Sequence, residues 1–134
     1  MEISDLYAIA ETNNHEVAEF RITASDSFSV RIDDRCYIAM APGLSHAEEK
    51  SLLAHELGHC EYGGFYNIHS KYEVRSKKEA KADKWAIIHV IPLPDLKAAI
   101  ASGCDSTFSL AEEFGVTEQF MKKALDFYAV RNLI

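Results

Sequence analysis

The sequence predicts an α+β protein in which one helix and a small antiparallel sheet precede a series of helices. Three short segments rich in β-branched and aromatic residues follow the first helical segment, and helical patterns occupy the rest of the chain. Strand patterns followed by helical patterns, without alternation, are typical of this class. The 134 residues contain no repeat or linker and match the size of one domain. We therefore expect a single domain over 1–134, with a helix and sheet (1–44), two central helices (45–91) and a helical tail (92–134).

The N-terminal helix is expected to begin near Ser4. Apolar residues at helical spacing follow, and Asn13-Asn14 is a sequence that readily stops a helix. Three strand segments come next, reading EVAEFRI, FSVRID and RCYIAMA, of which the first two alternate apolar with polar residues. Asp33-Asp34 indicates a hairpin turn, and Pro42-Gly43 ends the sheet region. We predict that the three strands form an antiparallel sheet.

Two long helices are predicted in the middle of the chain. Ser45 and Glu48 have the spacing of a capping box, so the first helix should run from there to about Tyr62. A loop of about a dozen residues is expected before the second helix, KKEAKADKWAIIHV, which the prolines of IPLP stop. The tail should contain a short helix from Asp95 and two more, STFSLAEEF and TEQFMKKALDFYAV.

Composition excludes several classes of protein. A net charge of −7 argues against nonspecific binding to nucleic acid or to an anionic membrane, and no apolar stretch has the length of a membrane span. No export signal is recognisable at the N-terminus. Three cysteines, an odd number without CxxC spacing, indicate free thiols in a reducing compartment. We expect a cytoplasmic protein, with Cys60 a small buried side chain.

The segment LLAHELGH carries the clearest chemical signal. His55 and His59 are four residues apart, so both imidazoles project from one face of the helix and can bind the same tetrahedral ion. Zinc is the usual occupant of a histidine and carboxylate site. Glu56 is placed to hold a water that the metal also binds, and to accept its proton during attack on a carbonyl. The pattern therefore predicts one catalytic Zn²⁺ per chain.

The alternative is a core helix with two satisfied histidines. Leu52, Leu53, Ala54 and Leu57 make this helix apolar on most sides, and buried titratable groups are costly unless something binds them. Gly58 lowers helix propensity by about 1 kcal/mol relative to alanine, which close packing near a site would explain. These features favour the metal site.

A third ligand is expected on the next long helix. Glu79 and Asp83 fall on one stripe with apolar residues, namely Ala82, Ala86, Ile87 and Val90, whereas the lysines lie mainly off it. We assign Glu79 as the third ligand. Asp83, one turn later, should orient a zinc-bound histidine by accepting its free ring N–H. Glu61 and Glu73 are weaker candidates for the third ligand, at a helix end and in a loop.

The combination of HELGH, the later E-x-x-A-D-x-W-A and a following proline resembles the ImmA/IrrE family of metallopeptidases, whose zinc-binding core is similar to that of gluzincins. The resemblance covers nearly the whole chain, although IIHVIP stands where many members carry a run like LLMP. It implies that Glu79 is the glutamate ligand and Asp83 the aspartate that follows it. It also implies a phage or mobile-element protein whose substrate is a helix-turn-helix repressor, cleaved to relieve repression.

The same sequence is compatible with other functions. A zinc-binding module that binds such a repressor with little turnover remains the main alternative. The tail resembles a helix-turn-helix superficially, but its few bases do not form a positive face, so packing or partner docking is favoured over DNA binding. Peptide hydrolysis also needs a group that stabilises the oxyanion, and His69, between the two long helices, is the candidate.

Overall fold

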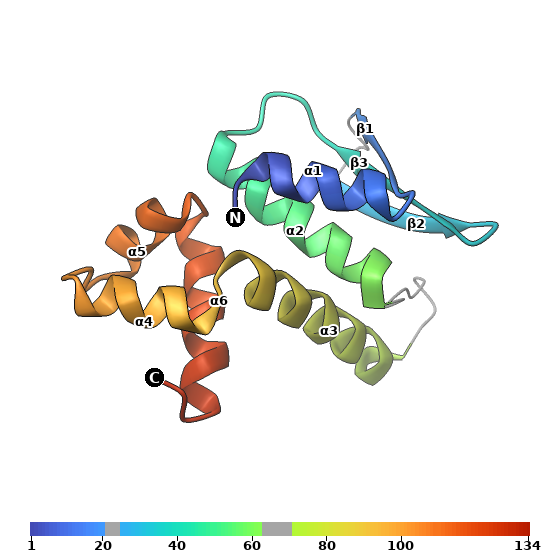
Figure 1. The fold of residues 1–134 in the computed structure, drawn as a ribbon. Helices are drawn as coiled ribbons and strands as arrows, with labels where there is room; N and C mark the ends of the chain where they lie inside the picture. The colour runs from blue at the N-terminus through green and yellow to red at the C-terminus, as the bar shows by residue number, and fades with distance from the viewer. Residues whose placement is uncertain (21–24, 63–70) are drawn as a thin grey trace.

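The computed structural model describes residues 1–20, 25–62 and 71–134, and shows six helices and three strands in these ranges (Figure 1). The α+β class is confirmed, because one helix and the sheet precede the remaining helices. No helix within the described ranges is long and apolar enough to cross a membrane. The elements are α1 (Ile3–Thr12), β1 (Glu16–Glu19), β2 (Ser27–Ile32), β3 (Arg35–Met40), α2 (His46–Tyr62), α3 (Tyr72–Val90), α4 (Leu93–Ala101), α5 (Thr107–Phe114) and α6 (Glu118–Val130).

The sheet has the strand order β1-β3-β2 and is mixed. β2 and β3 form the predicted hairpin, in which Asp33 and Asp34 have φ angles of 50° and 65°. Two successive positive φ values are typical of the tight turns that match strand twist, and aspartate tolerates them. β1, however, pairs with β3 in parallel. The prediction of a fully antiparallel sheet is therefore wrong in this one pairing.

Hydrogen bonds at the end of β3 accompany the parallel pairing. The N–H of Phe20, just after β1, donates to the carbonyl of Met40 (3.0 Å), and the N–H of Ala41 donates to the carbonyl of Asp26 (2.8 Å), just before β2. Phe20 and Asp26 therefore lie on opposite sides of β3, at the end of that strand. Alternating hydrophobicity identifies strands, but it carries no information on which strands are neighbours.

The helix starts show which local signals were reliable. Ser45 Oγ accepts from the N–H of Glu48 (3.1 Å) and Glu48 Oε1 accepts from the N–H of Ser45 (3.0 Å), so the predicted capping box is confirmed. α3 begins at Tyr72 rather than at 77; Val74, Arg75 and Ser76 are exposed and form no apolar stripe, so the sequence pattern did not reveal this start. α4 begins at Leu93 rather than Asp95, since proline is tolerated in the first turn of a helix.

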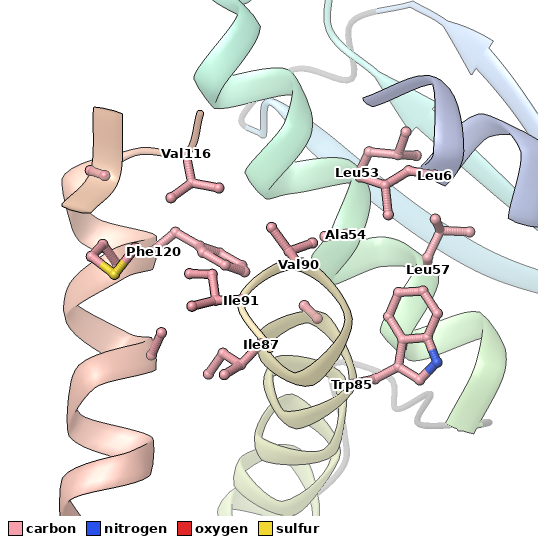
Figure 2. Close-up of a cluster of buried hydrophobic side chains, with 14 of the residues drawn as sticks. Leu6, Leu53, Ala54, Leu57, Trp85, Ile87, Val90, Ile91, Val116 and Phe120 are labelled. Carbon is pink, nitrogen blue, oxygen red and sulfur yellow. The ribbon is translucent and has the colours of Figure 1, made fainter. Parts of the chain in front are cut away.

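α2 lies at the centre of the molecule, in contact with α1, β2, β3 and α3. Leu53, Ala54 and Leu57 are fully buried, as the sequence predicted for this helix. Figure 2 shows these side chains beside Leu6 of α1 and Trp85 of α3. On the other side of α3, a second group of apolar side chains faces the C-terminal helices, formed by Ile87, Ile91, Val116 and Phe120 (Figure 2).

The C-terminal helices are attached to this core by buried polar contacts. Lys50 of α2 donates to the carbonyl of Phe114 at the end of α5 (2.5 Å), and the N–H of Thr117 donates to Ser51 Oγ (3.1 Å). The buried hydroxyl of Tyr128 donates to the carbonyl of Ile91 (2.7 Å). Thr117 also caps α6, because its hydroxyl accepts from the N–H of Phe120 (3.1 Å). The tail therefore packs against α2 and α3.

Two of the three cysteines are not free thiols. Cys36 of β3 and Cys60 of α2 form a disulfide between residues 24 positions apart, whose Cα atoms are separated by 5.7 Å, while Cys104 is free. The prediction of free thiols was wrong for this pair, because the fold brings together a strand and a helix whose proximity no spacing rule reveals. It also removes the cysteine argument for a reducing compartment.

Candidate metal centre

The site depends on an unusually close approach of α2 to α3. A Cβ added at Gly58 would lie 2.8 Å from the Cα of Ala82, and nearer still to the carbonyl oxygen of that residue. Real Cβ atoms do not come so close to a backbone, so only glycine is compatible with this helix separation. The two helices run side by side (Figure 1), and their contact places α3 next to the part of α2 that carries the two histidines.

His55, His59 and Glu79 come together at this contact. Their ligand atoms all lie within 4.8 Å of one another. The Nε2 atoms of His55 and His59 are 2.8 and 3.2 Å from the two carboxylate oxygens of Glu79. The imidazole rings meet edge to face with centroids 4.8 Å apart, as expected for positions i and i+4. α2 thus contributes two nitrogen donors and α3 one carboxylate.

These separations fit a metal ion. Donors placed about 2.0 Å from a tetrahedral ion lie about 3.3 Å from one another. The distances of 2.8 and 3.2 Å between the imidazole nitrogens and the Glu79 oxygens are only slightly shorter, so small side-chain adjustments would accommodate an ion. Three protein donors also leave a fourth position for a small molecule, as catalytic sites require.

Asp83 orients His55 from the opposite ring nitrogen. Its Oδ1 lies 2.8 Å from His55 Nδ1, while its Oδ2 is 3.6 Å from the ammonium of Lys123 on α6. Burial by itself lowers the pKa of His55, but hydrogen bonds to Asp83 and Glu79 outweigh it and raise that pKa to about 10. The surroundings of His55 therefore favour positive charge, and they direct Nε2 toward the same place as Glu79.

Glu56 lies beside these donors and is held by the sheet. Its side chain is buried, and its two oxygens accept hydrogen bonds from Ser27 Oγ (2.7 Å) and Ser29 Oγ (2.6 Å) of β2. Arg31, on the same face of that strand, donates to the carbonyl of Cys60 (3.1 Å). The polar face of β2 therefore packs on α2, whereas the apolar side chain of Phe28 is 45% exposed.

Ser27 and Ser29 were not among the site residues predicted from the sequence. A signal was available, because polar residues at alternate positions of a strand occupy one face. The sequence does not show whether that face points to solvent or toward the rest of the protein. A polar strand face ordinarily points to solvent, and here it covers the glutamate.

A cavity of about 220 Å³ opens beside the candidate ligands. His55, Glu79 and Asp83 line it from the α2–α3 side, and α6 closes the opposite side with Thr117, Gln119, Phe120 and Lys123. The C-terminal tail thus forms one wall of the site. Packing of the tail, one of the two roles expected for it from the sequence, places it next to the candidate metal donors.

Glu61, another candidate ligand from the sequence, is not part of this group within the described residues. Glu61 points away, accepting a hydrogen bond from Asn13 and lying 3.6 Å from the ring of His15. His69 and the side chain of Glu73 lie outside the described residues.

Comparison with known proteins agrees with this geometry. The family model of peptidase M78, described as the IrrE N-terminal-like domain, matches residues 10–126, which include the sheet, both site helices and most of α6. No curated protein sequence matches the chain. Because the family match extends over most of the 134 residues, the chain belongs to the peptidase M78 family of metal-dependent peptidases.

Proposed function

We propose that the protein is a zinc-dependent endopeptidase. The observation that carries the proposal is the convergence of His55, His59 and Glu79 from two helices, with Glu56 one residue from the first histidine. Two imidazoles and one carboxylate are a ligand set that zinc uses in catalytic sites. When bound, zinc supplies a Lewis acid that polarises the scissile carbonyl and acidifies a water molecule.

The residues of the chain have separate tasks in this proposal. Glu56 accepts the proton of the attacking water and passes it to the departing amine, as a general base and then a general acid. Ser27 and Ser29 keep its carboxylate in one orientation. Asp83 accepts the Nδ1–H of His55, so that Nε2 is the nitrogen left for the metal. His69 remains the proposed oxyanion stabiliser.

The substrate is proposed to bind as an extended segment between β2 and α6. Among the described strands β2 pairs only with β3, so it lies at an edge of the sheet, and its serines reach the general base. An edge strand can bind an extended peptide through its main chain, and side-chain pockets then provide selectivity. The cavity between Glu79 and α6 is suited to hold one substrate side chain.

The proposed substrate is a helix-turn-helix repressor-type protein, whose cleavage relieves repression. This part rests on the resemblance of HELGH and EAKADKWA to the ImmA/IrrE family. An intact repressor presents few extended segments, so cleavage is expected in a linker or loop of that protein.

The test uses a purified helix-turn-helix repressor, the proposed class of substrate, sought among the genes that flank this one. Wild-type protein loaded with zinc should cleave it, and Glu56→Gln should keep one zinc per chain yet cleave at least about a hundredfold more slowly, because the proton acceptor is lost. His55→Ala should lose the zinc of this site and should also lose cleavage of the repressor. His46→Gln, at the exposed start of the same helix, is the matched control and should behave as wild type. Fragments are identified by mass spectrometry and zinc by elemental analysis.

Two results would contradict the proposal. Undiminished cleavage by Glu56→Gln would exclude this glutamate as the base. Tight binding of the repressor by the zinc-loaded wild type without any cleavage would instead indicate a regulatory binding module.

A further inference from the structure

A second group of side chains able to bind a metal lies near the C-terminal end of α2, where Cys60 directly follows His59. His15, between α1 and β1, meets Cys36 of β3 and Cys60 of α2, and their ligand atoms all lie within 4.8 Å of one another. The three residues come from three separate parts of the chain. Both cysteines are buried, and the His15 side chain is only 10% exposed.

His15 has an unused nitrogen in this group. Its Nε2 is buried and, among the side chains that the structure describes, makes no hydrogen bond. An unpaired polar atom destabilises the fold when it is buried, so such an atom is expected to have a partner. The Oε1 of Glu61 is 3.6 Å away, close to the ~3.3 Å that separates two donors on one tetrahedral ion.

We propose that His15, Cys36, Cys60 and Glu61 form a second, redox-gated zinc site. In the oxidised protein Cys36 and Cys60 are joined by their disulfide and the site is closed. A thiol reductant transfers two electrons and two protons to this bond, leaving two thiols on the protein, while the sulfur atoms of the reductant form a new disulfide. Zinc then binds the two sulfurs as thiolates, with release of both thiol protons.

The chemistry of the donors supports zinc. Thiolate and imidazole together select zinc among the common divalent ions, and four protein donors make a closed, structural site rather than a catalytic one. With their Cα atoms 5.7 Å apart, the two cysteines need only side-chain rotation to separate their sulfurs by about 3.7 Å around one ion. In this proposal the group holds β3, α2 and the segment just before β1 together in both redox states.

This inference does not depend on the proposed peptidase activity. His15 and the cysteines are not donors of the His55–His59–Glu79 group. The two sites also differ in spectroscopy, because only the cysteine site can give a thiolate-to-metal charge-transfer band.

The experiment titrates the full chain with Co²⁺ alone, as a visible substitute for zinc. Oxidised protein should bind one Co²⁺ per chain without a thiolate-to-cobalt band in the near ultraviolet. Protein reduced with excess dithiol, and freed of it anaerobically, should bind two and show the band. Cys60→Ser should lose the band and one ion, whereas Cys104→Ser, the free-cysteine control, should keep both.

His15→Ala retains all cysteines and should weaken the band-forming site at least tenfold. It keeps the proposal testable if Cys60→Ser does not fold. His55→Ala should keep the band and lose only the other ion, so failure of one site is distinguishable from failure of the other. Reduced wild type that shows no band, or a band that survives in Cys60→Ser and disappears in Cys104→Ser, would overturn the proposal.

Discussion

At the scale of single residues, Glu56 illustrates how neighbouring side chains define a role. A buried carboxylate is costly unless its oxygens are hydrogen-bonded, and Ser27 and Ser29 each satisfy one oxygen. The same two bonds restrict rotation of the carboxylate. A general base must lie within hydrogen-bond reach of the proton that it accepts, so we infer that the serines contribute to catalysis through position alone.

Replacing both serines tests this inference. The double variant Ser27→Ala with Ser29→Ala should retain zinc but lower kcat about tenfold to a hundredfold, because a misplaced reacting group costs this much. Steady-state kinetics on a peptide derived from the cleaved bond, with zinc analysis, provide the measurement. Ser29→Thr keeps a hydroxyl and is expected to retain most of the activity. Wild-type kcat in the alanine double variant would show that Glu56 needs no such support.

At the scale of elements, the α2–α3 contact determines the geometry of the site. Two donors lie on α2 and one on α3, so a shift of one helix relative to the other separates them. Gly58 sets that separation, since the backbone of Ala82 occupies the space that a larger residue would need. The glycine thus sets the distance between the candidate donors without being one of them.

Gly58→Ala should therefore weaken both the fold and the site. We expect overpacking against backbone to cost about 3 kcal/mol, and the better helix propensity of alanine to offset about 1 kcal/mol of it. Urea denaturation should show a net loss near 2 kcal/mol, and zinc affinity should fall at least tenfold as Glu79 moves away. Adding Ala82→Gly should not restore either quantity, because backbone atoms make the contact. Unchanged zinc affinity in Gly58→Ala would refute the close-packing explanation.

At the scale of the whole molecule, the C-terminal helices are joined to the site helices. Phe120 and Val116 pack against Ile87 and Ile91 of the α3 end (Figure 2). Tyr128 adds a buried hydrogen bond to the carbonyl of Ile91. Because α6 also lines the cavity beside Glu79, packing of the tail against the site helices also completes this cavity.

Tyr128→Phe should destabilise the protein by about 1–2 kcal/mol, because the Ile91 carbonyl loses its buried partner. Burial raises the pKa of Tyr128 above its ordinary value of 10.0. The stabilisation by this tyrosine is therefore fully present below pH 10.0 and declines as the pH rises further, when the unfolded chain ionises first. Chemical denaturation of both proteins should show a stability difference that narrows above this pH.

The matched control is Tyr62→Phe, whose side chain is 45% exposed, and it should change stability little at any pH. A difference between wild type and Tyr128→Phe that stays constant into the alkaline range would contradict the role of burial.

The sequence by itself determined the parts of this protein that depend on local spacing. The i, i+4 histidines, the capping box at Ser45 and the carboxylate stripe on α3 each follow from the period of a helix, and the donors they predicted do meet. The α+β class followed in the same way, from the order of strand and helix patterns.

Only the tertiary structure decided which distant segments touch. The parallel pairing of β1 with β3, the serines that hold Glu56 and the Cys36–Cys60 disulfide all join elements whose proximity leaves no periodic trace in the sequence. Periodicity reports which face a side chain occupies on its own element. The partner of that face is selected by packing of the whole chain, in which the free energy depends on contacts between residues far apart in sequence.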